Sequence, residues 1–312
     1  MFLLGQTVGK YQVLANLGSG GFGTVFLARD TWIDKKVAIK VPHRQTGDAD
    51  ELLQEPRLLA ALDHPNIVGI LTAERVDGAF FIVMDYVKGE SLEAVLDREK
   101  SLDTPRALNY AVQILKGVEH AHEAQILHRD LRPANVLISE SGVCKVADFG
   151  TSRLLERSHA TTVIGSPPYM APEAFQGRAV LASDIYSAGS LFYEMVTGFP
   201  PIVLANPMEI YKKAKAGQWT PLSQKNASVS PELNFVIMKT MAADLRTRYA
   251  QATDVLHDLE HMTGKNHDYA SEMKDIQKRI QARENRTDYI CWNCRKATGR
   301  RVKTCPYCGE EQ

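Results

Sequence analysis

The sequence lacks net charge, abundant cysteine and long hydrophobic runs. Lysine plus arginine and aspartate plus glutamate each number 37. The chain as a whole therefore has no electric field that would gather nucleic acid or an anionic membrane around it. No stretch reaches the roughly 18 consecutive apolar residues of a membrane helix, and residues 1–10 have neither the basic start nor the apolar core of a secretion signal. These absences predict a cytoplasmic protein with no membrane partner.

The five cysteines are unevenly distributed. Cys144 stands alone in an apolar run, where we expect a small core residue. The other four form two CxxC pairs, Cys291-Trp-Asn-Cys294 and Cys305-Pro-Tyr-Cys308. This excludes a disulfide framework across the main part of the chain. Four thiolates favour one tetrahedral zinc ion, with iron or redox-active thiols as alternatives, and the second pair with its following glycine resembles a zinc ribbon.

The role of this tail is open. So short a unit cannot bury enough apolar surface to fold unaided, so the metal would supply its stability. The tail is locally basic, through Arg283, Arg286, Arg295, Lys296, Arg300, Arg301 and Lys303. A structural knuckle with a solvated face is the simplest interpretation, a protein partner of the zinc ribbon comes next, and nucleic acid ranks third.

Hydrophobic periodicity divides the rest of the chain into two lobes. Its composition of 44% hydrophobic and 24% charged residues is that of a globular protein. Short β-rich runs are predicted at 11–17, 24–29, 36–41, 67–72 and 80–84, with one helix over 50–63. Helices are predicted at 91–96, 105–124, 183–197, 232–241 and 251–262. We therefore predict an α+β fold with a β-rich N-lobe (11–87) and an α-rich C-lobe (88–262), then a charged helical linker (263–287) and a zinc ribbon (288–312).

A glycine-rich segment lies between the first two predicted strands. It reads Gly18-Ser19-Gly20-Gly21-Phe22-Gly23-Thr-Val25, which is a strand–turn–strand arrangement and not the strand-to-helix turn of dinucleotide folds. Glycines let a backbone approach phosphate oxygens and present its N–H groups to them. The motif alone is also compatible with an ordinary glycine hairpin.

Further along the chain come charged residues suited to phosphoryl transfer. Lys40 ends an apolar strand, where its ammonium can reach phosphates and pair with Glu55 or, less favourably, Glu51. Asp130 can accept the proton of an attacking hydroxyl, and Asn135 and Asp148 offer hard oxygen ligands for magnesium. Each residue alone has a structural explanation, but their combination indicates phosphoryl transfer.

These motifs occur together in the order found in eukaryotic-type protein kinases. They are Gly18–Val25, Val37-Ala-Ile-Lys40, His128-Arg-Asp-Leu-Arg-Pro-Ala-Asn135, Asp148-Phe-Gly150 and Ala171-Pro-Glu173. The resemblance spans residues 11–262 and is to the bacterial Ser/Thr kinases in particular. It implies a bilobal kinase fold, ATP with Mg²⁺ or Mn²⁺, and protein substrates phosphorylated on Ser or Thr.

The resemblance also implies roles for residues that the local pattern does not identify. It implies an adenine site lined by Leu17, Val25, Ala38 and Leu137, with Met84 as gatekeeper and backbone hydrogen bonds from Asp85 and Val87. It further implies that Glu173 pairs with Arg248 and that Asp184 supports the catalytic loop.

One catalytic position departs from the family pattern. Arg132 stands where Ser/Thr kinases usually have a lysine that contacts the transferred phosphate. Arginine keeps the charge but has a planar guanidinium, so rate and acceptor preference are open. The segment Gly165-Ser166-Pro-Pro-Tyr169 resembles the substrate loop of Ser/Thr kinases, with Ser166 in place of the commoner threonine, and disfavours a tyrosine kinase.

The segment between Asp148 and Ala171 is a candidate regulatory loop. Arg129 directly precedes Asp130, as in kinases controlled by loop phosphorylation, and the loop offers Ser158, Thr161 and Thr162. A phosphate there can order the loop by pairing with Arg129. We expect autophosphorylation at these sites; the alternative is that they are ordinary polar loop residues.

A competing hypothesis is an adaptor that binds partners through the zinc ribbon and uses ATP only as a conformational ligand. The complete set of catalytic residues favours the kinase. The sequence identifies neither the physiological substrate nor the oligomeric state.

Overall fold

The computed structural model describes residues 2–21, 23–43, 45, 52–53, 56–57, 59–149, 165–263, 303–309 and 311. Backbone contacts divide the chain into two units, Met1–Met262 and Thr263–Gln312. The first unit holds the predicted lobes, and the second holds the predicted linker and the cysteine tail.

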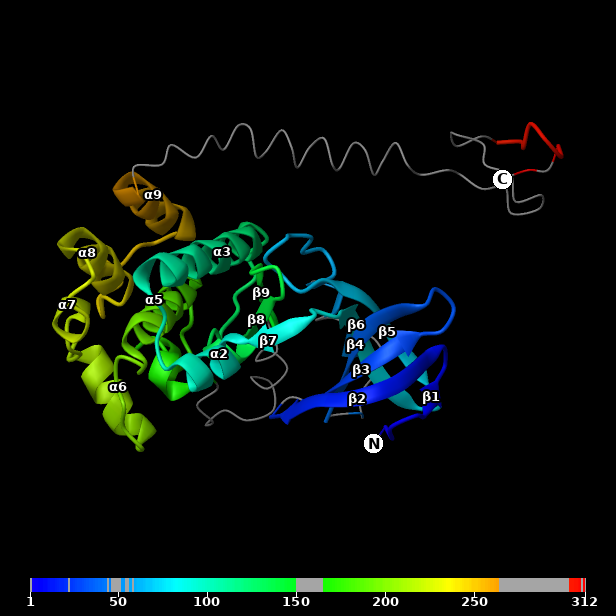
Figure 1. The fold of residues 1–312 in the computed structure, drawn as a ribbon, viewed down its shortest axis with the longest axis horizontal. Coiled ribbons are helices and arrows are strands. Elements are labelled where there is room, and N and C mark those ends of the chain that lie inside the picture. The colour runs from blue at the N-terminus through cyan, green and yellow to red at the C-terminus, as the bar shows by residue number, and fades with distance from the viewer. Residues whose placement is uncertain are drawn as a thin grey trace. The chain divides into compact units, whose positions relative to one another are not determined.

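The N-lobe is a six-stranded antiparallel sheet (Figure 1) with the order β1-β2-β3-β4-β6-β5. Its strands are β1 (Thr7–Val8), β2 (Tyr11–Gly20), β3 (Gly23–Asp30), β4 (Lys35–Pro42), β5 (Ile70–Val76) and β6 (Ala79–Asp85). Alternating apolar residues of β2, β3, β4 and β6 pack into one cluster that includes Tyr11, Phe26, Ile39 and Phe81. Asp77 and Gly78 join β5 to β6 as a two-residue turn, both with positive φ, which is the preferred hairpin geometry.

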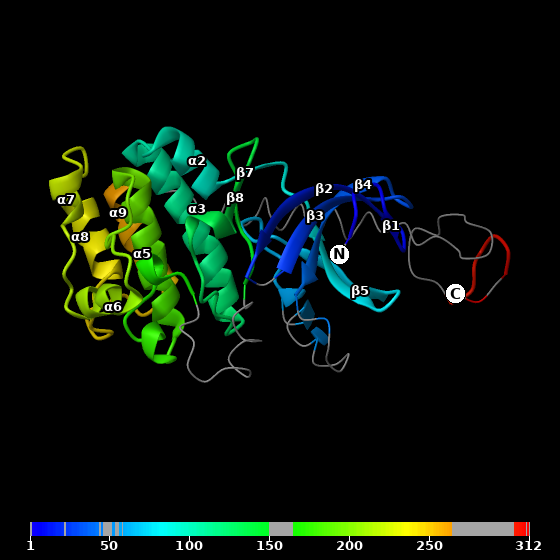
Figure 2. The same cartoon turned by 90° about the horizontal axis from the view of Figure 1, so that it is seen from below.

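The C-lobe is mainly helical, and Figure 2 shows its helices on the opposite side of the unit from the six-stranded sheet. Its helices are α2 (Leu92–Glu99), α3 (Thr104–Glu123), α5 (Leu181–Thr197), α6 (Pro207–Lys215), α7 (Leu222–Lys225), α8 (Pro231–Thr240) and α9 (Ala252–Thr263). A small sheet of β7 (Gly89–Ser91), β8 (Val136–Ser139) and β9 (Cys144–Val146) lies between the lobes. Side chains of Ser91, Asp103 and Ser230 accept hydrogen bonds from the first turns of α2, α3 and α8, which explains where these helices begin.

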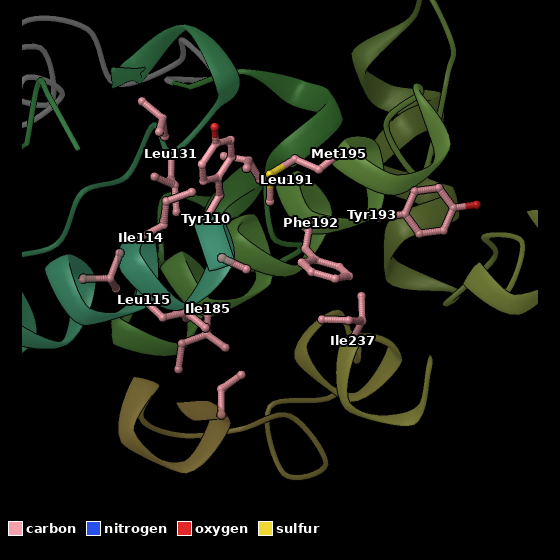
Figure 3. Packing of buried hydrophobic residues seen from close by; sticks show 14 of the residues in the cluster. Tyr110, Ile114, Leu115, Leu131, Ile185, Leu191, Phe192, Tyr193, Met195 and Ile237 are labelled. Carbon is pink, nitrogen blue, oxygen red and sulfur yellow. The ribbon is translucent and has the colours of Figure 1, made fainter. Parts of the chain in front are cut away.

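The C-lobe core lies where α3 and α5 pack together (Figure 3). Ile114 and Leu115 of α3 meet Ile185 and Phe192 of α5, and all four side chains are almost fully buried. Burying a side chain of this size stabilises a fold by roughly 1.5–3 kcal/mol. The α3–α5 pair is thus a rigid base for the loops that carry the candidate catalytic residues.

The elements differ from the sequence prediction in a few places. The strand predicted over 67–72 begins at Ile70 and runs to Val76, while Ile67 forms an isolated bridge with Val146. Strands β1, β7 and β8 and helices α6 and α7 were not predicted. Within the helix predicted over 50–63, the described residues 52–53, 56–57 and 59 are helical, and the chain leaves the helix at residue 60.

Candidate active site

The glycine-rich segment forms the turn of the β2–β3 hairpin. The strand register pairs Gly20 with Gly23. Gly23 has φ of +155°, and a Cβ there would lie 2.4 Å from the backbone oxygen of Val41, so close packing on β4 requires glycine. A Cβ on Gly18, Gly20 or Gly21 would meet no atom within 4 Å. These glycines therefore leave room for a ligand to approach the backbone.

Lys40 lies on β4 and reaches across to the C-lobe. Its side chain is 8% exposed, and its Nζ lies 2.6 Å from Oδ1 of Asp148. Asp148 has φ of +61°, a left-handed conformation that is uncommon outside glycine. The two residues line a pocket whose other lining residues are all apolar: Leu59, Leu62, Ile67, Val68, Ile70, Ile82, Met84 and Phe149.

The residues implied for adenine lie around the junction of the lobes. The register of β4 and β6 places Ala38 directly opposite Met84. Ala38 is buried, Met84 is half-buried, and Leu17 at the end of the hairpin is 48% exposed. The N–H of Asp85 donates to the carbonyl of Gly69 at 2.9 Å, so it is already engaged within the protein.

The catalytic loop brings Asp130 and Asn135 together. The Asn135 side-chain amide donates to the Asp130 carbonyl at 2.7 Å and to Asp130 Oδ2 at 3.2 Å. The backbone N–H of Ala147 donates to the carbonyl of Asn135 at 2.8 Å. His128 Nε2 lies 2.9 Å from the carbonyl oxygen of Ala147. The segment that leads into Asp148 is thus tied to the loop that carries Asp130.

Ser166 is a site residue that the sequence analysis noted without assigning it a role. Its hydroxyl donates to Asp130 Oδ1 at 2.9 Å and accepts from Arg132 Nη1 at 3.1 Å. The guanidinium of Arg132 is therefore linked to the Asp130 carboxylate through one hydroxyl. The sequence signal that could have identified Ser166 as a site residue is its place in the Gly165–Tyr169 segment.

A buried carboxylate holds the catalytic loop in place. Asp184 on α5 is 1% exposed and accepts backbone hydrogen bonds from His128 at 2.8 Å and Arg129 at 2.9 Å. His122 Nε2 lies 2.9 Å from the same carboxylate. Burial alone would raise the pKa of Asp184, but the hydrogen bond and charge of His122, with the backbone donors, lower it below its usual value. The predicted support of the catalytic loop by Asp184 is confirmed.

The predicted pairing of Glu173 with Arg248 is also confirmed. Arg248 Nη1 lies 2.6 Å from Glu173 Oε1, and the arginine side chain is fully buried. Ser183 donates to the same glutamate oxygen at 2.6 Å. Burial would raise the pKa of Glu173, but the hydrogen bonds from Arg248 and Ser183 lower it. This buried pair joins the end of the substrate-loop segment to the region before α9.

Several predicted site residues lie outside the described part of the chain. They are Phe22 of the glycine segment, Glu55 and Glu51, the loop residues Ser158, Thr161 and Thr162, and the cysteines Cys291 and Cys294. Their roles stay predictions.

The described part of the tail shows one of the two cysteine pairs. Cys305 is buried, and its Sγ accepts a hydrogen bond from the backbone N–H of Tyr307 at 3.4 Å. The N–H of Gly309, which has φ of +76°, donates to the Cys305 carbonyl at 2.9 Å. Among the described residues no group of three or more metal-ligating side chains is assembled. The segment is therefore a tight turn around one buried sulfur atom.

Known proteins have sequences similar to that of this chain. Residues 11–259 match the protein kinase domain family. The chain is 35% identical over 267 residues to the serine/threonine-protein kinase PrkC of Bacillus subtilis, covering 83% of this chain and 41% of that protein. It is 33% identical over 264 residues to the serine/threonine-protein kinase PknB of Mycolicibacterium smegmatis, covering 80% of this chain and 42% of that protein. The chain thus spans about two fifths of the length of these relatives.

A solved structure has a similar fold. The crystal structure of Rad53 1-466 in complex with AMP-PNP is 25% identical, with a TM-score of 0.70, and the match covers 80% of this chain and 64% of that one. The chain therefore belongs to the protein kinase domain family. Its kinase domain is of the bacterial serine/threonine type, which confirms the class predicted from the motifs. In the described part of the chain, no helix is both long and apolar enough to cross a membrane.

Proposed function

We propose that this chain is a protein kinase that transfers the γ-phosphate of ATP to serine and threonine hydroxyls of protein substrates. The observation that carries this proposal is the set of hydrogen bonds that meet at the Asp130 side chain. Its two carboxylate oxygens accept hydrogen bonds from Ser166 and Asn135, and the same loop is bonded to the strand end that carries Asp148. This leaves a carboxylate with a fixed orientation beside residues suited to hold phosphate groups.

The other site residues would bind the phosphates, the metal ion and the adenine of ATP. Lys40 would bind phosphate oxygens, and Asp148, its ion-pair partner in this structure, would hold a metal ion. The amide nitrogen of Asn135 donates to Asp130, so its amide oxygen would act as a metal ligand together with the Asp148 carboxylate. Magnesium or manganese held there would neutralise charge on the phosphates. Glycines 18, 20 and 21 let the hairpin backbone approach those phosphates, and the Ala38–Met84 region receives adenine.

The direct test compares wild type with Asp130→Asn. Purified proteins are incubated with magnesium-ATP and a generic protein acceptor, and transferred phosphate and ATP binding are both measured. Because Asn keeps the shape of Asp but accepts no proton, we expect ATP binding to persist and transfer to fall by about 10²–10⁴-fold. Equal transfer by both proteins would refute the role of Asp130. ATP binding without transfer by either protein would favour an ATP-binding adaptor.

Autophosphorylation of the loop before Gly165 is part of this proposal. Arg129 is held with φ of +69°, and its N–H is bonded to the buried carboxylate of Asp184. This fixed backbone supports a role for Arg129 in pairing with a phosphate on Ser158, Thr161 or Thr162. Phosphopeptide mapping of active enzyme should find phosphate on at least one of the three residues, and its absence from all three would contradict the proposal.

We also propose that the tail is a zinc ribbon that targets or regulates the kinase. Support comes from the turn at Cys305, in which the backbone N–H of Tyr307 donates to the buried sulfur and so fixes its position. Cys305 and Cys308 would supply two of the four ligands, and Cys291 and Cys294 the others. The kinase unit would not need this tail for chemistry.

Two measurements test the tail. Elemental analysis of the purified full chain should give about one zinc per chain, and Cys305→Ser should lose it. Cys144→Ser is the matched control, because Cys144 is buried in the kinase unit. Zinc retained by Cys305→Ser, or iron in its place, would contradict the proposal. A chain truncated before residue 291 should still phosphorylate the generic acceptor.

A further inference from the structure

Arg132 contacts two different groups with the two ends of its guanidinium. Nη1 donates to the Ser166 hydroxyl at 3.1 Å, and that hydroxyl donates to Asp130. Nη2 lies 3.7 Å from Oε1 of Glu93. A planar guanidinium with one nitrogen on each partner has a defined orientation, which a single contact would not give it.

Glu93 is fixed by the helix that carries it. It lies in the first turn of α2, whose start is capped by the side chain of Ser91. Leu92, Val95 and Leu96 of the same helix are buried in the C-lobe core, so the helix cannot shift easily. The Glu93 side chain itself is 54% exposed, so replacing it should not disturb folding. Glu93 thus has an exposed side chain on a helix, α2, whose position is fixed by its buried residues.

Arg132 and Glu93 lie close to a partly buried hydrogen bond between Tyr169 and Glu194. Tyr169 donates to Glu194 Oε2 at 2.6 Å. Burial and the Glu194 carboxylate raise the pKa of Tyr169, while Arg132 opposes that rise and Glu93 adds to it. Burial and the charges of Glu93 and Asp97 raise the pKa of Glu194. The charges of Arg132 and Glu93 thus act on the same half-buried Tyr169, and losing Glu93 would remove the contact that holds one edge of the guanidinium.

We propose that Glu93 is a positioning residue for phosphoryl transfer: it holds one edge of the Arg132 guanidinium so that the other edge bonds Ser166 and, through it, orients Asp130. This rests on the proposed kinase function. A second contact is needed because residue 132 is an arginine. The lysine usual at this position has a single ammonium group, with no second nitrogen that a partner such as Glu93 could hold.

The test is a double-mutant cycle of Glu93→Gln and Arg132→Lys, with kcat and KM for ATP measured in each protein. In the wild-type background we expect Glu93→Gln to lower kcat about three- to five-fold without changing KM for ATP. In the Arg132→Lys background we expect no further effect of Glu93→Gln. Glu140→Gln is the control: it removes the carboxylate of an exposed ion pair, with Lys88, and should leave kcat unchanged.

The outcomes separate this inference from its alternatives. Unchanged kcat in Glu93→Gln would overturn it. An undiminished effect in the Arg132→Lys background would also overturn it, because Glu93 would then act on the acceptor directly. A crystal structure of Glu93→Gln is a test that needs no turnover: Arg132 should leave Ser166, and a retained 3.1 Å contact would refute the inference. Failure of the wild type to transfer phosphate would instead refute the kinase function.

Discussion

The ammonium of Lys40 lies 2.6 Å from Oδ1 of Asp148, although the two residues are 108 positions apart in the sequence. This ion pair bridges the two lobes and neutralises two charges that the proposed reaction needs separately. Lys40 is expected to bind phosphates, and Asp148 a metal ion. Occupation of the site by ATP and magnesium should therefore replace the direct pair with contacts of each residue to the bound groups.

Asp148→Asn should abolish phosphate transfer, with a loss of about 10³-fold or more, because an amide cannot supply the anionic metal ligand. Asparagine tolerates the positive φ at this position, so the protein should still fold. Asp77→Asn is the matched control, since Asp77 also has a positive φ but lies in the β5–β6 turn. Steady-state transfer rates and melting temperatures measure both effects. Near-normal turnover by Asp148→Asn would contradict the assigned role.

Ser166→Ala should lower kcat about tenfold, because it removes a hydroxyl that is bonded to both Asp130 and Arg132. Ser166→Thr keeps the hydroxyl and should retain most of the activity. Initial rates at saturating ATP, measured together with KM, distinguish the two variants. If Ser166→Ala and wild type turn over equally, the hydroxyl does not link Arg132 to Asp130 in the reacting complex.

Two glycines of the hairpin should respond differently to alanine. Gly23→Ala should lower stability by about 1–3 kcal/mol, because its Cβ would clash with the Val41 carbonyl. Gly20→Ala has open space around its Cβ and should leave the melting temperature unchanged while raising KM for ATP. Thermal melts and ATP titrations measure the two effects. Unchanged ATP affinity in Gly20→Ala would show that the hairpin backbone does not approach the nucleotide there.

Glu173 should make stability depend on pH in the acid range. Its folded-state pKa is lowered from 4.5, because the Arg248 and Ser183 hydrogen bonds outweigh the opposing effect of burial. A lowered pKa adds stability that is fully present above the unfolded value and is lost as the pH falls through the folded value. Glu173→Gln should therefore cost about 3–5 kcal/mol at pH 7, since it leaves Arg248 buried without its charged partner.

A pH series tests this prediction about Glu173. In urea titrations from pH 7 to pH 3, the difference in unfolding free energy between wild type and Glu173→Gln should shrink below about pH 4.5. A difference that stays constant across this range would mean that the Glu173 charge does not stabilise the fold.

Sequence patterns predicted the elements that depend on local periodicity. The β2, β3, β4 and β6 strands and the long helices α3, α5 and α9 lie within a few residues of their predicted bounds, because each buries a regular apolar pattern. Strand β1 has only two residues and therefore no period to detect. Helix α6 is short, yet its Asn206 cap followed by Pro207 is a recognisable start signal that could have identified it.

The candidate site was predictable to the extent that its residues lie in contiguous motifs. The glycine segment, Lys40, Asp130, Asn135 and Asp148 were found in this way. The links of Ser166 and Glu93 to Arg132 were not, because each joins segments that are distant in the sequence and meet only after the C-lobe has folded. A surface ion pair such as Arg132–Glu93 has no sequence signature of its own.

The most direct test of the central claim is phosphopeptide mass spectrometry of an acceptor protein that contains serine, threonine and tyrosine. The acceptor is incubated with magnesium-ATP and either wild type or Asp130→Asn. A serine/threonine kinase that depends on Asp130 predicts phosphate on serine or threonine with wild type alone. Phosphate on tyrosine only, equal phosphate with both proteins, or none with a wild type that binds ATP would contradict it.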